Sequence, residues 1–464
     1  MSLLIVLAAL IFLMVVAYRG SSVILFAPLA ALGAVLFTDP SLVAPMFTGV
    51  FMAKMADFLK LYFPVFLLGA VFGKMIELSG FSKSIVASLI QVVGRRRAIL
   101  SIVAVSALLT YGGVSLFVVV FAVYPFAAEM FRQSDIPKRL IPGTIALGAF
   151  TFTMDALPGT PQIQNIIPTT FFKTDIYAAP WLGVIGGLFI LTSGIAYLEW
   201  RRRIAAAAGE GYGTVLVNEP EAFVHDKSAP AVVAVIPLLL VAGVNKWLTV
   251  LIPAYYKASH SFTPSGGKSA PVVQEIANVK AVWAVEGALL VGILSVLVLA
   301  WKPVTTRFVE GSRAAIAGAL LAAMNTASEY GFGAVIAALP GFLVVADALK
   351  VISNPLANEA LTVTSLAGIT GSASGGLSIA LAAMGETFLQ NAQAAHIPPE
   401  VLHRVAAMAS GGMDTLPHNG AVITLLAVTG LTHRVAYRDV FAITLIKTTA
   451  VFVVIAVYYL TGLV

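Results

Sequence analysis

Two aspartates in matching sequence contexts are the first candidates for chemistry. Asp155 and Asp414 each follow a methionine, precede a proline by three residues, and interrupt a long apolar segment. A carboxylate at the centre of a membrane costs roughly 2.5–3.5 kcal/mol, so such groups usually face a cavity and mark a route for protons or ions. The alternative role is to cap the half-helix that follows, by accepting hydrogen bonds from its free N–H groups. One side chain can fill both roles.

Polar side chains follow each Leu-Pro pair and differ between the two copies. Exposed N–H groups and the helix dipole at the start of a half-helix favour an anion, and amide and hydroxyl groups there suit an anionic substrate. The candidate substrate ligands in these breaks are Thr160, Gln162, Asn165 and Asn419. An unperturbed histidine titrates near pH 6.5, so His418 could carry a proton or pair with a carboxylate, with a purely structural role as the alternative.

Small residues at two further interruptions predict the tips of re-entrant hairpins. Glycine permits a tight reversal and a close approach of the backbone to a substrate, whereas the alternative is an ordinary helix–helix contact through small residues. The candidate ligands at these tips are Gly112, Gly113, Ser115, Gly371, Ser372 and Ser374. Glu329 lies in an otherwise apolar helix and is a further candidate proton carrier, unless it pairs with a basic neighbour. Lys74 and Glu77 have the spacing of a structural ion pair.

The composition determines the class of protein that must position these residues. Of 464 residues, 59% are hydrophobic and 11% are charged, and the mean hydropathy is +0.95. A soluble protein carries about 25% charged residues, so this chain is predicted to be an all-α polytopic membrane protein. It has no cysteine, which excludes disulfides and thiolate sites. Because no nucleotide-binding, hydrolase or zinc motif is present, neither an enzyme, a cofactor nor a metal is expected.

The apolar runs predict about ten full crossings, since a spanning helix needs about 20 apolar residues. Uninterrupted runs occupy 3–18, 21–37, 61–80, 179–200, 229–252, 279–301, 312–338 and 440–463. Hairpins are expected at 98–131 and 360–393, and broken helices at 139–173 and 399–431. Irregular backbone survives at membrane depth only where it is buried in protein or lines a wet cavity. Residues 41–59 and 82–93 are expected to lie at the interface, and 204–228 and 253–278 to form loops.

Basic residues lie in short clusters between the apolar runs, the pattern of topology-setting charges rather than of nucleic-acid binding. These clusters are Arg95–Arg97, Lys138 with Arg139, Arg201–Arg203, Lys302 with Arg307 and Arg313, and Arg434 with Arg438. With the 201–203 cluster in the cytoplasm, residues 302–313 form a cytoplasmic connection and both termini are external. Hairpin 98–131 then opens to the cytoplasm and 360–393 to the outside. His403 and Arg404 fall outside, as an exception to the rule.

These features predict two inverted repeats, a signature of secondary transporters with a site near the midplane. The predicted parts are N-terminal helices and an interfacial segment at 1–60, a first repeat at 61–203, loops and linking helices at 204–311, and a second repeat at 312–464.

The chain resembles the gluconate permease family of organic-anion carriers. The resemblance rests on Gly73-Lys74-Met75 with Gly80, Leu157-Pro158-Gly159-Thr160-Pro161, Gly371-Ser372-Ala373 and Ser410-Gly411-Gly412. It implies a scaffold, a transport domain with two re-entrant hairpins, and proton-coupled uptake of sugar acids or small hydroxy acids. Typical gluconate permeases differ at Asp155-Ala156-Leu157-Pro158, where they carry a histidine-glycine and paired prolines.

The sequence thus predicts a multi-pass protein of the bacterial inner membrane that imports a small organic anion with protons. The anion is gluconate, a related sugar acid, or a short hydroxy acid such as 3-hydroxybutyrate. Asp155, Asp414, His418 and Glu329 are the predicted coupling residues. A sodium-coupled di- or tricarboxylate carrier and a passive anion channel are the alternatives, since unwound carbonyls with Asp and Asn also bind Na⁺. The expected partners are the anion, protons or Na⁺, and the lipid bilayer. The sequence does not decide between a monomer and a homodimer.

Overall fold

The fold is almost entirely helical in the computed structural model. The structure describes all residues except 1, 20, 94–96, 115, 214–216, 220–228, 264–270, 343, 345–351 and 418. Five helical segments in the described part of the chain are long and apolar enough to cross a membrane: Pro40–Leu78, Pro180–Ala207, Ala231–Tyr256, Ile276–Leu299 and His433–Thr461. The predicted class of all-α polytopic membrane protein is confirmed. The predicted number of crossings stays a prediction.

The N-terminal region is a helical pair followed by one long helical segment. Helices α1 (Ser2–Tyr18) and α2 (Val23–Thr38) pack together. The next segment runs without interruption through η1 (Pro40–Leu42), α3 (Val43–Met46), the π-helical turn η2 (Phe47–Met52) and α4 (Ala53–Leu78). Residues 41–59 are thus helical and continuous with α4. Their predicted place at the membrane interface stays a prediction.

The first half contains the predicted hairpin and the predicted broken helix. Its elements are α5 (Phe81–Val93), α6 (Ala98–Tyr111), α7 (Leu116–Gln133), η4 (Lys138–Leu140), α8 (Ile141–Ala149), α9 (Phe152–Asp155), α10 (Ile163–Phe172) and α11 (Pro180–Ala207). Helices α6 and α7 form the hairpin. The broken helix is α8 and α10, with the short α9 inside the break.

The second half has the same order of main elements. They are α14 (Trp301–Ala337), the hairpin α16 (Pro355–Thr370) and α17 (Ala373–Ala394), the broken helix α18 (Pro399–Ser410) and α19 (Gly420–Thr429), and α20 (His433–Thr461). They correspond in order to α4, α6, α7, α8, α10 and α11. The opposite membrane orientation of the two halves stays a prediction.

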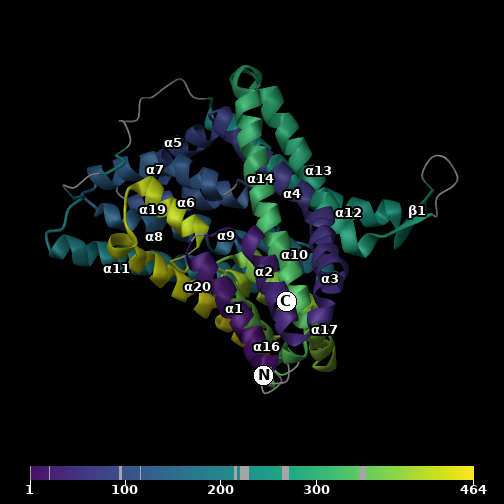
Figure 1. Cartoon of the computed structure of the whole chain (residues 1–464). Coiled ribbons are helices and arrows are strands. Elements are labelled where there is room, and N and C mark those ends of the chain that lie inside the picture. The colour runs from purple at the N-terminus through teal and green to yellow at the C-terminus, as the bar shows by residue number, and fades with distance from the viewer. Residues whose placement is uncertain are drawn as a thin grey trace.

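The connection between the halves differs from the prediction at two places. Residues 253–278 were expected to be loop, but β1 (Ser259–Phe262) and β2 (Val272–Glu275) pair antiparallel there, between α12 (Ala231–Tyr256) and α13 (Ile276–Leu299). This β-hairpin extends away from the helical body at one side (Figure 1). Residues 302–313 were expected to form a short connection, but they are the first turns of α14. Pro303 lies in the first turn, where proline is tolerated, so the apolar helix continues into its basic flank. Their cytoplasmic location stays a prediction.

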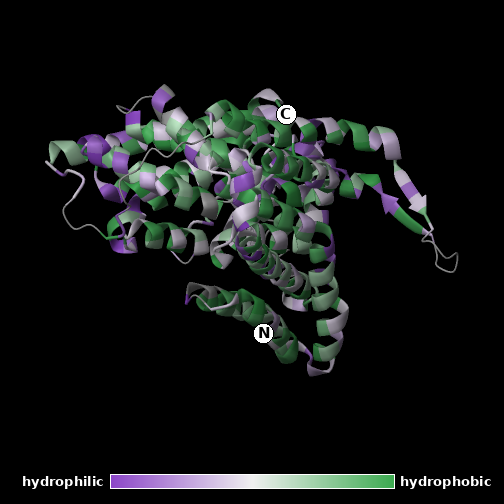
Figure 2. Ribbon diagram, turned by 90° about the horizontal axis from the view of Figure 1, so that it is seen from above, coloured by the Kyte–Doolittle hydropathy of each residue, from purple (hydrophilic) through white to green (hydrophobic). Residues whose placement is uncertain are grey.

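The arrangement of the helices brings the breaks of the two broken helices together. Helix α14 packs along α4, α13 packs on α4, and α11 packs on α20 (Figure 1). Each hairpin packs on the first segment of the broken helix in its own half, α6 on α8 and α16 on α18. Helix α10 contacts α17 and α18, so the halves meet at the breaks. Hydrophobic residues dominate the ribbon, and the projecting β-hairpin is among its more hydrophilic parts (Figure 2).

Candidate functional site

Each hairpin tip is tied to the broken helix of its own half by one side-chain amide. Gln162 Nε2 donates to Thr110 O at 2.7 Å, and Asn419 Nδ2 donates to Gly371 O at 2.8 Å. Gln162 and Asn419 are the residues directly before α10 and α19. The halves therefore use the same device, in which the start of the second half-helix holds the end of the first hairpin helix.

The first tip also packs against the linking helices. A Cβ atom on Gly112 would lie 2.7 Å from Leu238 Cδ2 of α12, so a larger residue there would displace the Leu238 side chain. Gly113 has a φ of +91° and faces Pro161 of the break. At the second tip, Gly371 ends α16 in the left-handed conformation, and Ser372 Oγ accepts from Gly375 N at 3.0 Å to begin α17.

Asp155 lies in the first break, with its carboxyl group directed at the second break. The residue is only 2% exposed. A Cβ atom on Gly411, which ends α18, would lie 3.1 Å from Asp155 Cγ and would overlap Oδ2. Oδ1 has no hydrogen-bond partner among the described residues. Because a buried polar atom without a partner is unusual, this oxygen is a candidate binding atom for a proton, water or ligand.

Arg404 of α18 fills the first break from the opposite half. Its Nη1 donates to Asp155 O at 2.9 Å and to Asn165 Oδ1 at 3.0 Å, while Nη2 donates to Ala178 O at 2.7 Å and Nε to the same oxygen at 3.2 Å. The neighbouring His403 contacts Asn165 Oδ1 through Nε2 at 3.1 Å and Thr174 Oγ1 through Nδ1 at 2.7 Å. Both basic residues are fully buried.

The burial of this basic pair corrects the predicted topology at one point. His403 and Arg404 were expected to fall outside, as an exception to the positive-inside rule. Arg404 instead donates to main-chain carbonyls of Asp155 and Ala178, and His403 contacts two side chains of the first half, so both residues are structural groups inside the protein rather than topology signals.

Lys447 of α20 joins the second break to the first. Its Nζ forms an ion pair with Asp414 Oδ1 and donates to Phe150 O at 3.1 Å, at the end of α8. Lys447 is 2% exposed and Asp414 is 9% exposed. In the same break, Thr415 Oγ1 contacts Thr444 Oγ1 at 2.6 Å. Two carboxylates and two cations thus gather where the breaks meet: Asp155, Asp414, Arg404 and Lys447.

Most of the predicted ligand side chains bond to the protein itself. Asn165 Nδ2 donates to Thr160 O and Ile176 O at 3.0 and 2.8 Å, and Thr160 Oγ1 donates to Thr153 O at 2.7 Å. Asn419 Oδ1 accepts from Val422 N at 2.9 Å, so Asn419 and not Asp414 caps α19. These side chains fix the shape of the breaks, and their role toward a substrate stays a prediction.

The remaining predicted residues lie at the second tip or outside the described part of the chain. Ser374 Oγ contacts Thr326 Oγ1 of α14 at 3.2 Å, and the Glu329 carboxyl lies directly against Gly375 at the start of α17. Glu329 is 2% exposed, and its Oε2 has no partner within the described ranges. Ser115 and His418 lie outside the described residues, as do Arg95 and Arg96. The predicted Lys74–Glu77 ion pair is present at 2.7 Å.

Other buried polar atoms without a described partner identify residues outside the predicted set of site residues. In the first half they are Ser106 Oγ, Thr110 Oγ1 and Gln164 Oε1; in the second half, they are Ser328 Oγ, Ser378 Oγ and both carboxyl oxygens of Glu359. Single serines and threonines in apolar helices carry no sequence signal of such a role, because most of them bond to their own helix.

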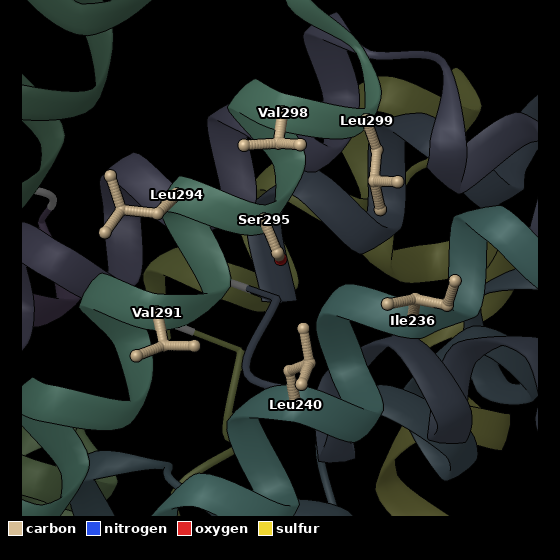
Figure 3. A pocket seen from close by; sticks show the side chains of 7 residues that line it. All are labelled: Ile236, Leu240, Val291, Leu294, Ser295, Val298 and Leu299. Carbon is tan, nitrogen blue, oxygen red and sulfur yellow. The ribbon is translucent and has the colours of Figure 1, made fainter.

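A shallow apolar groove on the outer surface lies apart from this polar centre. It lies between α12 and α13, has a volume of about 340 Å³ and is lined by Ile236, Leu240, Val291, Leu294, Ser295, Val298 and Leu299 (Figure 3). The hydroxyl group of Ser295 donates to Gly292 O at 2.7 Å. The groove therefore offers no polar group to an anion, and the breaks are the candidate site.

Comparison with known proteins supports a transporter. The chain is 60% identical, over the full length of both proteins, to a Bacillus subtilis (strain 168) protein described as the uncharacterized transporter YxjC. The chain belongs to the YxjC transporter family. No protein-family model matches it.

A solved structure resembles the fold. The YdaH transporter of Alcanivorax borkumensis, whose crystal structure is described as having an unusual topology, superposes with a TM-score of 0.50 at 16% sequence identity, over 92% of this chain and 90% of that one. At this identity, the likeness concerns the fold alone. Together with the apolar spans, membership of the YxjC family makes this chain a multi-pass membrane transporter. The resemblance to gluconate permeases stays a prediction.

Proposed function

We propose that this YxjC-family transporter is a secondary carrier of the bacterial inner membrane that imports a small organic anion together with protons. The carrying observation is the carboxyl group of Asp155, which lies in one break, touches Gly411 of the other, and has an oxygen without a described partner. Because this carboxyl group contacts both breaks, binding of a proton to it can affect both halves of the protein.

The charges at the breaks support cotransport of one proton with a monoanion. Asp155 and Asp414 balance Arg404 and Lys447 when both acids are ionised and His403 is neutral. Protonation of Asp155 leaves one uncompensated positive charge in a buried region, which is costly. Binding of a monoanion restores the balance, so proton and anion stabilise each other's binding.

The N-termini of α10 and α19 supply a suitable environment for such an anion. Both helices begin directly after the breaks, at the half-buried Gln162 and the buried Asn419, where free N–H groups and the helix dipole favour negative charge. The unpartnered atoms of Thr110 and Gln164 are the proposed first contacts for its hydroxyl and carboxylate groups. Glu329 and His418 are proposed as further proton carriers. Gluconate, related sugar acids and short hydroxy acids such as 3-hydroxybutyrate are the proposed substrates.

The experiment that tests this proposal is uptake into proteoliposomes with an imposed inward proton gradient. Labelled gluconate and 3-hydroxybutyrate are supplied separately, and other sugar and hydroxy acids compete for uptake. Accumulation above the external concentration, abolished by a protonophore, is the expected result. Uptake that only equilibrates would instead identify a passive anion channel.

A further inference from the structure

Oxygen atoms in and beside both breaks surround buried cationic side chains. Around the Arg404 guanidinium lie Asp155 O, Ala178 O and Asn165 Oδ1, all within 3.2 Å of one of its nitrogens. They come from the first break, from the segment before α11 and from α10. The first half thus forms an oxygen cage whose occupant comes from the other half.

The second cage is formed around the Lys447 ammonium. It contains Asp414 Oδ1 from the second break and Phe150 O from the end of α8, and the ammonium is buried with them. This cage thus combines a carboxylate with a main-chain carbonyl at the end of a helix, whereas the first cage has main-chain carbonyls and an amide oxygen.

Unwound backbone carbonyls and the C-terminal ends of half-helices coordinate the coupling Na⁺ in secondary transporters, and carboxylate and side-chain amide oxygens are further ligands that hard cations prefer. In this chain, nitrogen atoms of covalently attached cations stand at those places. We propose that Arg404 and Lys447 are tethered substitutes for coupling sodium ions, so that transport by this protein does not use Na⁺. The inference rests on the proposed secondary transport and selects its proton-coupled form over the sodium-coupled alternative.

A tethered cation supplies the charge that the cage needs but never leaves it. Removing the ammonium of Lys447 leaves Asp414 as an uncompensated buried charge, a change that is strongly destabilising. A truncation that also leaves space lets a small cation enter, and a ligand that binds only the folded state raises its melting temperature. Sodium dependence is therefore expected to appear in a variant, although the native protein lacks it.

The test is the thermal unfolding of the purified full-length protein in detergent, in NaCl and in choline chloride of equal ionic strength. The native protein is expected to have the same Tm in both salts. Lys447→Ala is expected to lower the Tm in choline and to regain several degrees in NaCl. Lys447→Met fills most of the same space with an uncharged side chain and leaves no room for a cation. It is expected to lower the Tm without regaining stability in NaCl.

Two further variants serve as controls. Asp414→Asn/Lys447→Met removes both charges and is expected to recover Tm relative to Lys447→Met, again without a sodium response. Lys54→Ala removes a cation from an exposed pair with Asp57, at 3.5 Å, and is expected to change neither the Tm nor its salt dependence.

Three outcomes would overturn the inference. They are a sodium-specific rise in the Tm of the native protein, uptake of gluconate or 3-hydroxybutyrate driven by a sodium gradient, or a folded Lys447→Ala variant whose Tm is the same in NaCl and in choline chloride. The Tm of the native protein needs no variant, so it tests the inference even if Lys447→Ala does not fold. Failure of the proposed transport is recognised separately, as absence of accumulation under either gradient.

Discussion

The guanidinium of Arg404 is predicted to make a large contribution to stability, and Arg404→Met tests it. Methionine retains much of the buried aliphatic volume but donates no hydrogen bond. The change leaves Asp155 O and Ala178 O without the donor seen in the structure, while Asn165 Oδ1 keeps His403. Each orphaned buried acceptor costs about 1–3 kcal/mol, so the expected loss in the free energy of unfolding is about 3–5 kcal/mol, typical of a broken buried charged contact.

The assay is equilibrium unfolding in detergent micelles, with Arg202→Met as the matched control. Arg202 also donates to an oxygen at 2.7 Å, that of Glu199 one turn earlier, but it is 37% exposed at its side chain. An exposed pair contributes less than about 1 kcal/mol. Arg404→Lys keeps the charge with fewer donors and is expected to fall between the two. Equal stability of Arg404→Met and Arg202→Met would refute the role of Arg404 in closing the first break.

Three further predictions concern other contacts. Gly411→Ala pushes a Cβ into the Asp155 carboxyl and is expected to cost about 1–3 kcal/mol; Gly318→Ala, which meets no atom within 4 Å, should not destabilise the protein, and denaturation of both variants checks this. Asn419→Ala removes the cap of α19 and the bond to the second tip, and is expected to cost about 1–3 kcal/mol by the same measurement, with a neutral result contradicting the cap. Burial raises the pKa of the Glu219 carboxyl, but hydrogen bonds from Lys138 and Arg132 outweigh it and hold that pKa below its ordinary value. Its stabilisation is thus complete above about pH 4.3 and is lost as the pH falls through the lowered pKa; protease cleavage in 208–219 should rise on acidification in the native protein but not in Glu219→Gln.

The breaks and hairpins could be predicted because their signals are local. Glycine and proline within apolar runs mark the tips and the interruptions, and the paired Asp155 and Asp414 mark corresponding positions in the two halves. The structure places both aspartates at the meeting point of the breaks. Local chemistry thus identified where the backbone leaves the helix.

The partners of those aspartates could not be predicted in the same way. Arg404 contacts the main chain of Asp155 from 249 positions away in the sequence. Lys447 lies within a run that reads as an ordinary spanning helix, where a single lysine gives no indication of its partner. The continuous helix through 302–313 was missed for a related reason, because basic residues at the end of a helix and in a short loop look alike in sequence.

The most direct test of the central claim is to compare accumulation and exchange in Asp155→Asn. The asparagine keeps the size of the side chain, but its amide does not take up and release a proton. Proton-driven accumulation of gluconate or 3-hydroxybutyrate in proteoliposomes is therefore expected to vanish. Counterflow exchange, which needs no net proton movement, is expected to remain measurable. Accumulation by Asp155→Asn at the native level would contradict the account and remove Asp155 from the coupling mechanism.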